Sequence, residues 1–313
     1  MLDIVIVNWN SGRQLAEAVG SIAKHHENAV AKVIIVDNDS GDDSIAQVEG
    51  MDRALPFPIH ILRNGANLGF GAACNQGAAQ GSAPFILFLN PDAQLYAGSL
   101  SRPLDFMART AYADVGICGV QLIDEHGVVA RSCSRFPSLS AFWADAIGLS
   151  RVPALRSLGN HMVDWKHDET REVDQVIGAF FLIRRPLFDS LQGFDKRFFV
   201  YYEEVDVALR AKQAGWKSMY LADVQAFHAG GGTSSQVKAK RLFYSLRSRL
   251  FYGLKHFPGP KVALLLLLTL FIEPVTRSLF FLLKGRTADV RQTMQGYIAL
   301  YRDLPKIVGG GKV

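Results

Sequence analysis

Polar side chains that suit nucleotide and cation binding stand at the ends of three short apolar runs. In chain order they are Asn8, Asp37, and Asn90 with Asp92. Each apolar run is typical of a strand buried on both faces in a parallel sheet, and ligands of open α/β sheets bind at the carboxyl ends of such strands. Hard divalent cations take oxygen ligands and bridge phosphates, so two carboxylates at neighbouring strand ends indicate a site for a nucleotide and a cation.

A second acidic group, Glu203, Glu204 and Asp206, follows six residues that include four aromatic ones. Acidic residues in the first turn of a helix also suit its dipole, so simple capping is the alternative. Arg210 follows Asp206 by four positions and is expected to pair with it along a helix, as a structural pair. A carboxyl in apolar surroundings has a raised pKa and can act as a base near neutral pH, which leaves Glu203 or Glu204 for chemistry.

Small residues mark two further places where a ligand or another backbone segment approaches closely. Asn67 and Gly69 lie in a glycine- and alanine-rich loop, and Gly178 and Ala179 interrupt an apolar run. The full dinucleotide-binding glycine spacing is missing from the loop, so tight packing of a helix on a sheet is an equal interpretation. His228 ends an apolar stretch before three glycines, and its imidazole could complete the coordination of a cation held by Asp92.

Alternating strands and helices must position these residues. Two strands with a helix between them form a right-handed βαβ unit, which predicts that Asn8 and Asp37 lie on the same edge of one sheet. We expect a hairpin over 115–130 and an irregular segment over 135–174. The expected strands are 4–7, 32–36, 59–63, 85–89, 176–184 and 219–222, with helices over 70–80, from 186 to 191 and after 202.

The composition fits a globular α/β chain. Its 313 residues are 49% hydrophobic and 20% charged, and the formal net charge is +5. The basic residues are not interleaved with aromatic ones in the first two-thirds, so nucleic acid is not an expected partner. Three widely spaced cysteines and the lack of a leader-like start favour a reducing, cytoplasmic location.

The last third changes character from Lys238 onward. Basic residues alternate with apolar and aromatic ones over 238–261, and two apolar stretches follow at 262–272 and 278–283. Neither stretch alone reaches the about 20 residues of a membrane span. We expect helices lying in a membrane interface rather than oligomer-forming helices or a true span. The sequence thus predicts a catalytic domain over 1–235 and a helical segment over 236–313.

The ordered set of motifs resembles the family 2 glycosyltransferases, in particular the rhamnosyltransferase-like branch that builds bacterial surface polysaccharides. The resemblance covers about residues 2–235, and its motifs are Asp37, Asn90-Pro91-Asp92, Glu203-Glu204-Val205-Asp206 and His228-Ala229-Gly230-Gly231. It implies the GT-A fold, a mostly parallel Rossmann-like sheet flanked by helices. It also implies a nucleotide-sugar donor, a divalent cation (Mg²⁺ or Mn²⁺) and inversion at the anomeric carbon.

The resemblance also implies roles for single residues. Asp37 would hold the nucleoside, Asp92 and His228 the cation, and Glu204 would be the general base. Two departures are that Asn90 replaces one metal carboxylate and that Glu204 stands where the family usually has Asp, so Glu203 remains a rival base. The residues assigned to donor binding are Asn8, Asp37, Asn67, Gly69, Asn90, Gly178 and Ala179.

The leading hypothesis is therefore a metal-dependent inverting glycosyltransferase at the inner face of the cell membrane. By the resemblance, its donor would be dTDP-rhamnose, with UDP-sugars next, and its acceptor a polyprenyl-diphosphate-linked or other glycan. A non-catalytic sugar-nucleotide-binding scaffold is one alternative. A nucleotidyltransferase ranks lower, because only Arg13 is available near the first loop to bind a triphosphate.

Overall fold

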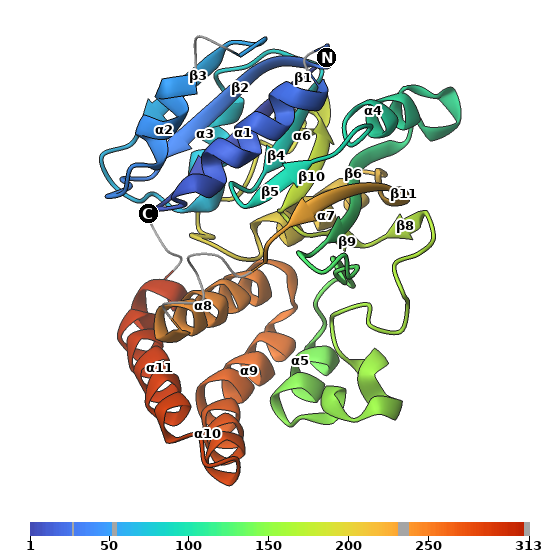
Figure 1. Cartoon of the computed structure of the whole chain (residues 1–313). Helices are drawn as coiled ribbons and strands as arrows, with labels where there is room; N and C mark the ends of the chain where they lie inside the picture. Colours follow the sequence, from blue (N-terminus) through green and yellow to red (C-terminus); the bar gives the residue numbers. More distant parts are fainter. Residues whose placement is uncertain (27, 52–54, 231–237, 310–313) are drawn as a thin grey trace. The chain divides into compact units, whose positions relative to one another are not determined.

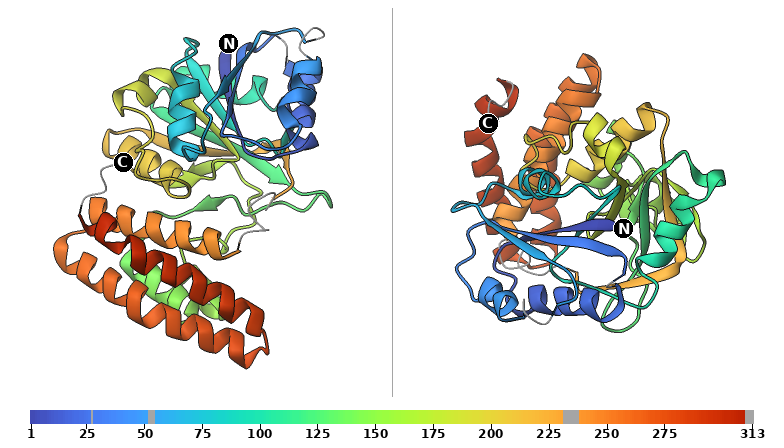
Figure 2. Two further views of the ribbon diagram at one scale, coloured as in Figure 1. Left: turned by 90° about the vertical axis from the view of Figure 1, so that its left-hand side faces the viewer. Right: turned by 90° about the horizontal axis from the view of Figure 1, so that it is seen from above.

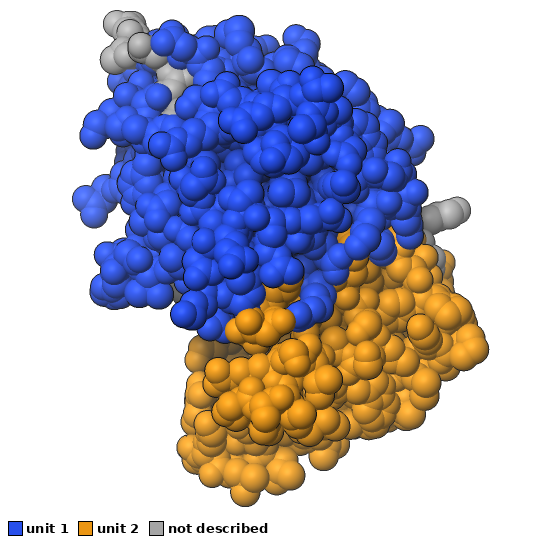
Figure 3. Space-filling view, turned by 90° about the vertical axis from the view of Figure 1, so that its right-hand side faces the viewer, with its two compact units in different colours: residues 1–135, 165–195, 204–233 blue, residues 136–164, 196–203, 234–313 orange. Residues whose placement is uncertain are grey.

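The computed structural model describes residues 1–26, 28–51, 55–230 and 238–309 (Figure 1). The chain divides into two compact units (Figure 3). Unit 1 comprises residues 1–135, 165–195 and 204–233, and unit 2 comprises 136–164, 196–203 and 234–313. The boundary predicted between 235 and 236 lies outside the described residues. Two segments from the middle of the chain thus group with the C-terminal helices.

Unit 1 is built on a mixed sheet in the strand order β3-β2-β1-β4-β10-β6-β11-β5, with β8 paired to β11. Its first four strands are parallel, whereas β10 is antiparallel to both of its neighbours. The strands are β1 Leu2–Asn8, β2 Val30–Asp37, β3 Ile59–Arg63, β4 Phe85–Leu89, β5 Ala93–Leu95, β6 Val115–Ile123, β8 Arg171–Val173, β10 Phe180–Arg184 and β11 Lys217–His228; β7 Cys133–Ser134 and β9 Gln175–Val176 form a separate pair.

Helices cover both faces of this sheet because its central strands carry apolar side chains on both faces. Figure 2 shows α1 and α2 on one face and α3 on the other. A side chain added at Gly77 of α3 would lie 2.4 Å from Val5, so the missing Cβ lets this helix pack closely on β1. The helices of this part of the chain are α1 Arg13–His26, α2 Ser44–Met51, α3 Phe70–Ala78, α4 Ser101–Ala108, α6 Arg185–Ser190 and α7 Glu203–Gln213.

The predicted α/β sheet is confirmed, with four local differences. The strand expected over 176–184 is wrong, because Gly178 and Ala179 form a turn between β9 and β10. The second arm of the expected hairpin is not a strand, and a single isolated bridge joins Ile123 to Val129. The strand expected over 219–222 extends to His228, and the short strands β5 and β8 are additions to the sheet that the sequence did not predict.

Unit 2 is helical. Helix α8 (Lys238–His256) packs against α11 (Thr287–Val308), and α11 also packs against α10. The two apolar stretches belong to one continuous 25-residue helix, Gly259–Leu283, made of α9, a π-helical turn and α10. The remaining elements are α9 Gly259–Leu267, the π-helical turn η6 Leu268–Ile272, α10 Glu273–Leu283, α5 Leu139–Ala146, and the 3-10 helices η3 Leu149–Arg151 and η4 Pro153–Leu158.

Candidate active site

Asn8 and Asp37 meet at the ends of the neighbouring parallel strands β1 and β2. They are register partners, and the Asn8 Nδ2 amide donates to Asp37 Oδ1 at 2.8 Å. The same amide lies 2.9 Å from the Ser44 hydroxyl, and Asp37 Oδ2 accepts from the Ser40 backbone amide at 3.3 Å. Both residues are more than nine-tenths buried. Asn8 therefore fixes the orientation of the Asp37 carboxylate at the sheet edge.

A second amide network holds the glycine-rich loop beside this corner. Buried Asn38 donates to the Gly69 carbonyl at 3.3 Å and accepts from the Asn64 amide at 2.8 Å. Asn67 Oδ1 accepts from the Gly69 backbone amide at 3.0 Å. Asn67 thus shapes the loop that precedes α3. Asn38 was not predicted as a site residue, although its place directly after Asp37 was a usable signal.

The corner after β4 lies against the turn between β9 and β10. The Asn90 backbone amide donates to the Ala179 carbonyl at 3.1 Å, and a Cβ at Gly178 would lie 3.7 Å from the Phe70 ring. Strand β4 is the parallel neighbour of β1, with Leu89 opposite Ile6. The strand ends that carry Asp37, Asn8 and Asn90 thus lie on consecutive strands.

Asp92 and His228 are brought together by the pairing of β5 with β11. His228 is the register partner of Ala93, and the Ala229 amide donates to the Asp92 carbonyl at 3.2 Å. The imidazole Nε2 lies 3.4 Å from Asp92 Oδ1, and the two side chains are 14% and 12% exposed. The two predicted metal ligands are therefore neighbours, which the strand expected over 219–222 did not reveal.

Asp92 and His228 could hold a divalent cation, whose remaining ligands would come from substrate and water. Within the described residues no group of three His, Cys, Asp or Glu side chains gathers in a metal-binding arrangement. A carboxylate oxygen and an imidazole nitrogen at this separation suit Mn²⁺, and cations in nucleotide sites usually keep open positions for phosphate oxygens and water.

The acidic group at the start of α7 separates into different environments. The Glu204 Oε2 atom is buried and has no hydrogen-bond partner among the described residues, and burial raises the pKa of this carboxyl. Glu203 is 5% exposed and its Oε2 atom is buried as well, so burial does not separate the two glutamates. Asp206 is fully buried and pairs at 2.8 Å with Arg210, which also donates to the carbonyls of two loop residues. Asp206 is thus held in an ion pair, whereas both glutamates keep a carboxylate oxygen in buried surroundings, where a carboxyl can act as a base.

The backbone before α7 is strained. Tyr201 and Tyr202 have φ angles of 69° and 71°, a left-handed conformation that is unusual for non-glycine residues. Such conformations cluster at functional sites, where the surrounding structure holds them. From the sequence these tyrosines indicate only apolar surroundings, since aromatic residues carry no signal for a left-handed backbone conformation.

Comparison with known proteins identifies the family of this chain. The sequence model of the family described as "Glycosyl transferase family 2" matches residues 3–191. The chain is 29% identical over 253 residues to an N-acetylglucosaminyl-diphospho-decaprenol L-rhamnosyltransferase of Mycobacterium tuberculosis, covering 77% of this chain and 80% of that protein. It is 27% identical over 172 residues to the rhamnosyltransferase WbbL of Escherichia coli, covering 54% of this chain and 61% of that protein.

Solved structures share the fold at low sequence identity. The mannosyltransferase PcManGT of Pyrobaculum calidifontis, in complex with GDP-Man and Mn²⁺, superposes with a TM-score of 0.57 at 14% identity, covering 96% of this chain and 86% of that one. TarS of S. aureus in complex with UDP-GlcNAc gives 0.54 at 14% identity, covering 96% and 91%. Since the family match spans more than half of the sequence and the fold agrees with it, this chain belongs to glycosyl transferase family 2 and is a glycosyltransferase.

Proposed function

We propose that the protein transfers rhamnose from dTDP-rhamnose to a lipid-linked glycan acceptor, in a cation-dependent, inverting reaction. The observation that carries the cation-dependent part is the Asp92–His228 pair next to the corner that follows β4. The sugar is proposed from the names of two relatives, both rhamnosyltransferases. UDP-sugars remain the second class of donor.

In this proposal the donor lies along the strand ends. Asp37, oriented by Asn8, accepts hydrogen bonds from the nucleoside, and the Asn67–Gly69 loop and the Gly178–Ala179 turn line the rest. Asp92 and His228 would hold Mg²⁺ or Mn²⁺, which neutralises the charge of the diphosphate leaving group when bound.

Glu204 is the proposed general base. Its buried carboxyl has a raised pKa, which brings it toward the operating pH. It takes the proton from the acceptor hydroxyl, whose oxygen attacks the anomeric carbon as the bond to the diphosphate oxygen breaks on the opposite face. Direct displacement of this kind inverts the anomeric centre. Glu203 remains the rival base.

The test is nucleoside diphosphate release by the purified full chain against a panel of sugar nucleotides, with Mn²⁺, with Mg²⁺ and with EDTA. We expect release from dTDP-rhamnose that EDTA abolishes. Release from a different sugar nucleotide alone would refute the proposed donor, and release unaffected by EDTA would refute the cation requirement. Donor binding, seen as a thermal shift, without turnover even when acceptor is present would instead favour the scaffold alternative.

Variants connect the measured activity to the site. Asp92→Ala and Glu204→Gln are expected to abolish most release, because they remove a cation ligand and the base. Glu125→Gln is the matched control, since its side chain is 78% exposed on a turn. Equal activity in all three variants would contradict the assignment of these carboxylates.

The acceptor is proposed to be a polyprenyl-diphosphate-linked glycan, reached at the inner, cytoplasmic face of the cell membrane. From Lys238 to Arg286 the sequence has ten Lys or Arg residues and one acidic residue, Glu273, which is buried. Helix Gly259–Leu283 is long and apolar enough to cross a membrane. Six of its exposed apolar side chains recur every three or four residues: Leu264, Leu267, Phe271, Val275, Leu279 and Leu282.

This apolar stripe and the surrounding positive charge favour a helix lying in the surface of an anionic bilayer. We expect the protein to sediment with vesicles that contain anionic lipid. A Phe271→Glu variant, altering a side chain that is 65% exposed, should bind such vesicles less tightly, whereas Val128→Glu, 60% exposed in unit 1, should not. Self-association that is lost in Phe271→Glu, with no vesicle binding by the wild type, would favour the oligomer alternative.

A further inference from the structure

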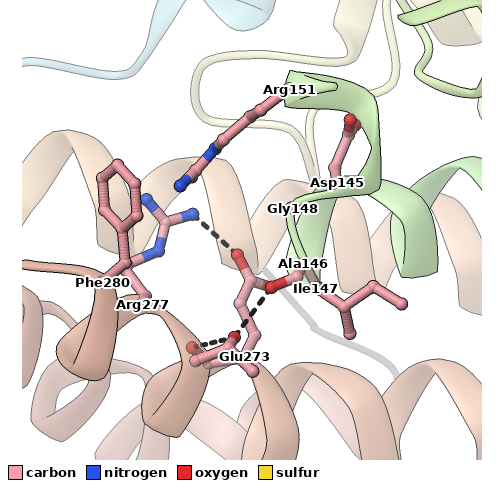
Figure 4. Close-up of a pocket in the computed structure, with 9 residues that line it drawn as sticks. Asp145, Ala146, Ile147, Gly148, Arg151, Glu273, Arg277 and Phe280 are labelled. Carbon is pink, nitrogen blue, oxygen red and sulfur yellow. Dashed lines mark hydrogen bonds and ion pairs between the residues drawn. The ribbon is translucent and has the colours of Figure 1, made fainter. Parts of the chain in front are cut away.

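A cavity of about 280 Å³ lies within unit 2, between the end of α5, the following 3-10 turn and one side of α10 (Figure 4). Its charged lining residues are Asp145, Arg151, Glu273 and Arg277. None of the residues proposed to bind the donor or the cation, or to act as the base, lines this cavity. Any ligand that it binds is therefore distinct from the substrates of the proposed transfer.

The floor of the cavity is a buried carboxylate shared by two arginines. Glu273 is 3% exposed, and its Oε1 accepts from Arg277 at 2.7 Å while Oε2 accepts from buried Arg249. Burial raises the pKa of Glu273, but the charges of Arg249 and Arg277 together outweigh this and leave its pKa lowered. The carboxylate is therefore ionised at neutral pH, and one of the two positive charges beside it is not neutralised.

Arg151 brings a second guanidinium group to the lining of the cavity, beside Arg277. The Arg151 guanidinium lies 4.0 Å from the centre of the Phe280 ring, and Figure 4 shows it next to the guanidinium of Arg277. No carboxylate lies within ion-pair distance of Arg151 in the parts of the chain that are described. Asp145 is turned toward Gly159, whose added Cβ would lie 3.0 Å from the Asp145 carboxylate.

The lining residues alone are balanced, with two arginines (Arg151, Arg277) against two carboxylates (Asp145, Glu273). Buried Arg249 does not line the cavity but shares Glu273 with Arg277, so the cluster as a whole has an excess of one positive charge, and the guanidinium groups of Arg151 and Arg277 lie side by side. Neighbouring like charges repel unless an anion lies between them. Guanidinium groups bind phosphate with paired, charge-assisted hydrogen bonds, and a phosphate offers more acceptor oxygens than a carboxylate does.

We propose that this cavity binds a phosphate group, held between the guanidinium groups of Arg151 and Arg277. The group is carried either by a small soluble phosphate ester or by a phospholipid head group. Stacking on Phe280 and the ion pair with Glu273 orient the two guanidinium groups before the ligand arrives, which lowers the entropic cost of binding. The proposal does not rest on the proposed transfer reaction.

Calorimetric titration of the full chain with sodium phosphate and with glycerol 3-phosphate, at constant ionic strength in chloride, tests the soluble source. Sedimentation with vesicles containing phosphatidate, compared with vesicles of equal charge containing phosphatidylserine, tests the lipid source. In both arms the decisive quantity is the difference between wild type and Arg151→Gln, because phosphate bound elsewhere is unaffected by that substitution.

We expect Arg151→Gln to weaken binding about tenfold or more, the effect of losing hydrogen bonds to a charged group. Arg156→Gln, an exposed arginine in the next 3-10 turn that does not line the cavity, is the matched control. Arg277→Lys keeps the positive charge beside Glu273 but removes the paired N–H donors of the guanidinium group, and should also weaken phosphate binding. A loss confined to the soluble esters or to phosphatidate vesicles supports the proposal and identifies the source. Equal binding by wild type and Arg151→Gln in both arms, or an equal loss in the control, would overturn it.

Discussion

Glu273→Gln removes the negative charge that two arginines share in unit 2, while keeping the size and shape of the side chain. In the wild type, Glu273 and Arg249 are 3% and 7% exposed, and Arg277 donates to the same carboxylate at 2.7 Å. The variant leaves Arg249 buried with no charged partner on Glu273. The expected result is a large loss of stability in the helices that carry these side chains, α8 and α10.

The size of the loss follows from the burial. Removing one partner of a buried ion pair costs about 3–5 kcal/mol, because an uncompensated charge stays in a low-dielectric interior. Every 1.4 kcal/mol changes an equilibrium constant tenfold. Amides in α8 and α10 that exchange by unfolding of the helices should therefore exchange about 10²–10⁴ times faster in the variant.

Hydrogen exchange followed by mass spectrometry measures this on peptides from the two helices. Asp289→Asn is the control in the same unit, since its partners Lys238 and Arg286 are 61% and 51% exposed and surface pairs stabilise little. An increase of less than tenfold in the Glu273 variant, or one no larger than in the control, would refute the reasoning that these charges are buried and coupled.

The pH dependence of the same measurement has a defined sign. The pKa of Glu273 is lowered in the folded protein relative to its ordinary value of 4.5. Its stabilising contribution is therefore complete above pH 4.5 and is lost as the pH falls below that value toward the lowered pKa. The difference in exchange between wild type and Glu273→Gln should shrink with acidification below pH 4.5, and a difference that stays constant there would contradict this assignment.

Three further predictions concern unit 1. Glu204→Gln should lower turnover about 10²–10⁴-fold. Because burial raises the pKa of Glu204 above 4.5, ionisation of this carboxyl destabilises the fold as the pH rises. The variant should therefore melt at a higher temperature than wild type at pH 7 and at the same temperature at pH 4, and a lower melting temperature at pH 7 would contradict this. Asp206→Asn should lower the free energy of unfolding in urea by about 3–5 kcal/mol, since Arg210 loses its buried partner, and a loss below 1 kcal/mol would show that the pair is dispensable. Gly77→Ala should cost about 1–3 kcal/mol in the same assay, because the new methyl would lie 2.4 Å from Val5, and an unchanged midpoint would show that α3 moves freely.

The order of the sheet could be predicted from the sequence only where strands follow one another through a βαβ connection. Asn8 and Asp37 end two such strands, so their meeting followed from the handedness of the connection. The place of β10 between β4 and β6 could not be predicted, because antiparallel insertion depends on pairing between distant segments. Local patterns carry no information on such pairing.

In the candidate site, too, contacts within one element could be predicted from the sequence, whereas contacts between distant segments could not. Asp92 and His228 could be named individually from their residue types, but their contact depends on β5, a strand of three residues that gives no periodic signal. The pairing of Asp206 with Arg210 could be predicted because a spacing of four residues determines it within one helix. Asn38 directly follows Asp37, which marks it as a strand-end residue, but its contacts with Asn64 and Gly69 could not be predicted, because buried amides that bridge loops have no characteristic spacing.

The antiparallel pairing of β11 with β5 also determines when the proposed cation site can form during synthesis of the chain. Asp92 emerges from the ribosome long before His228, and the earlier strands can begin to fold in the interval. The contact between Asp92 and His228 cannot form until β11 has joined the sheet. A nascent chain that ends short of His228 therefore lacks half of the pair, and such a fragment should not consume sugar nucleotide before the sheet is complete.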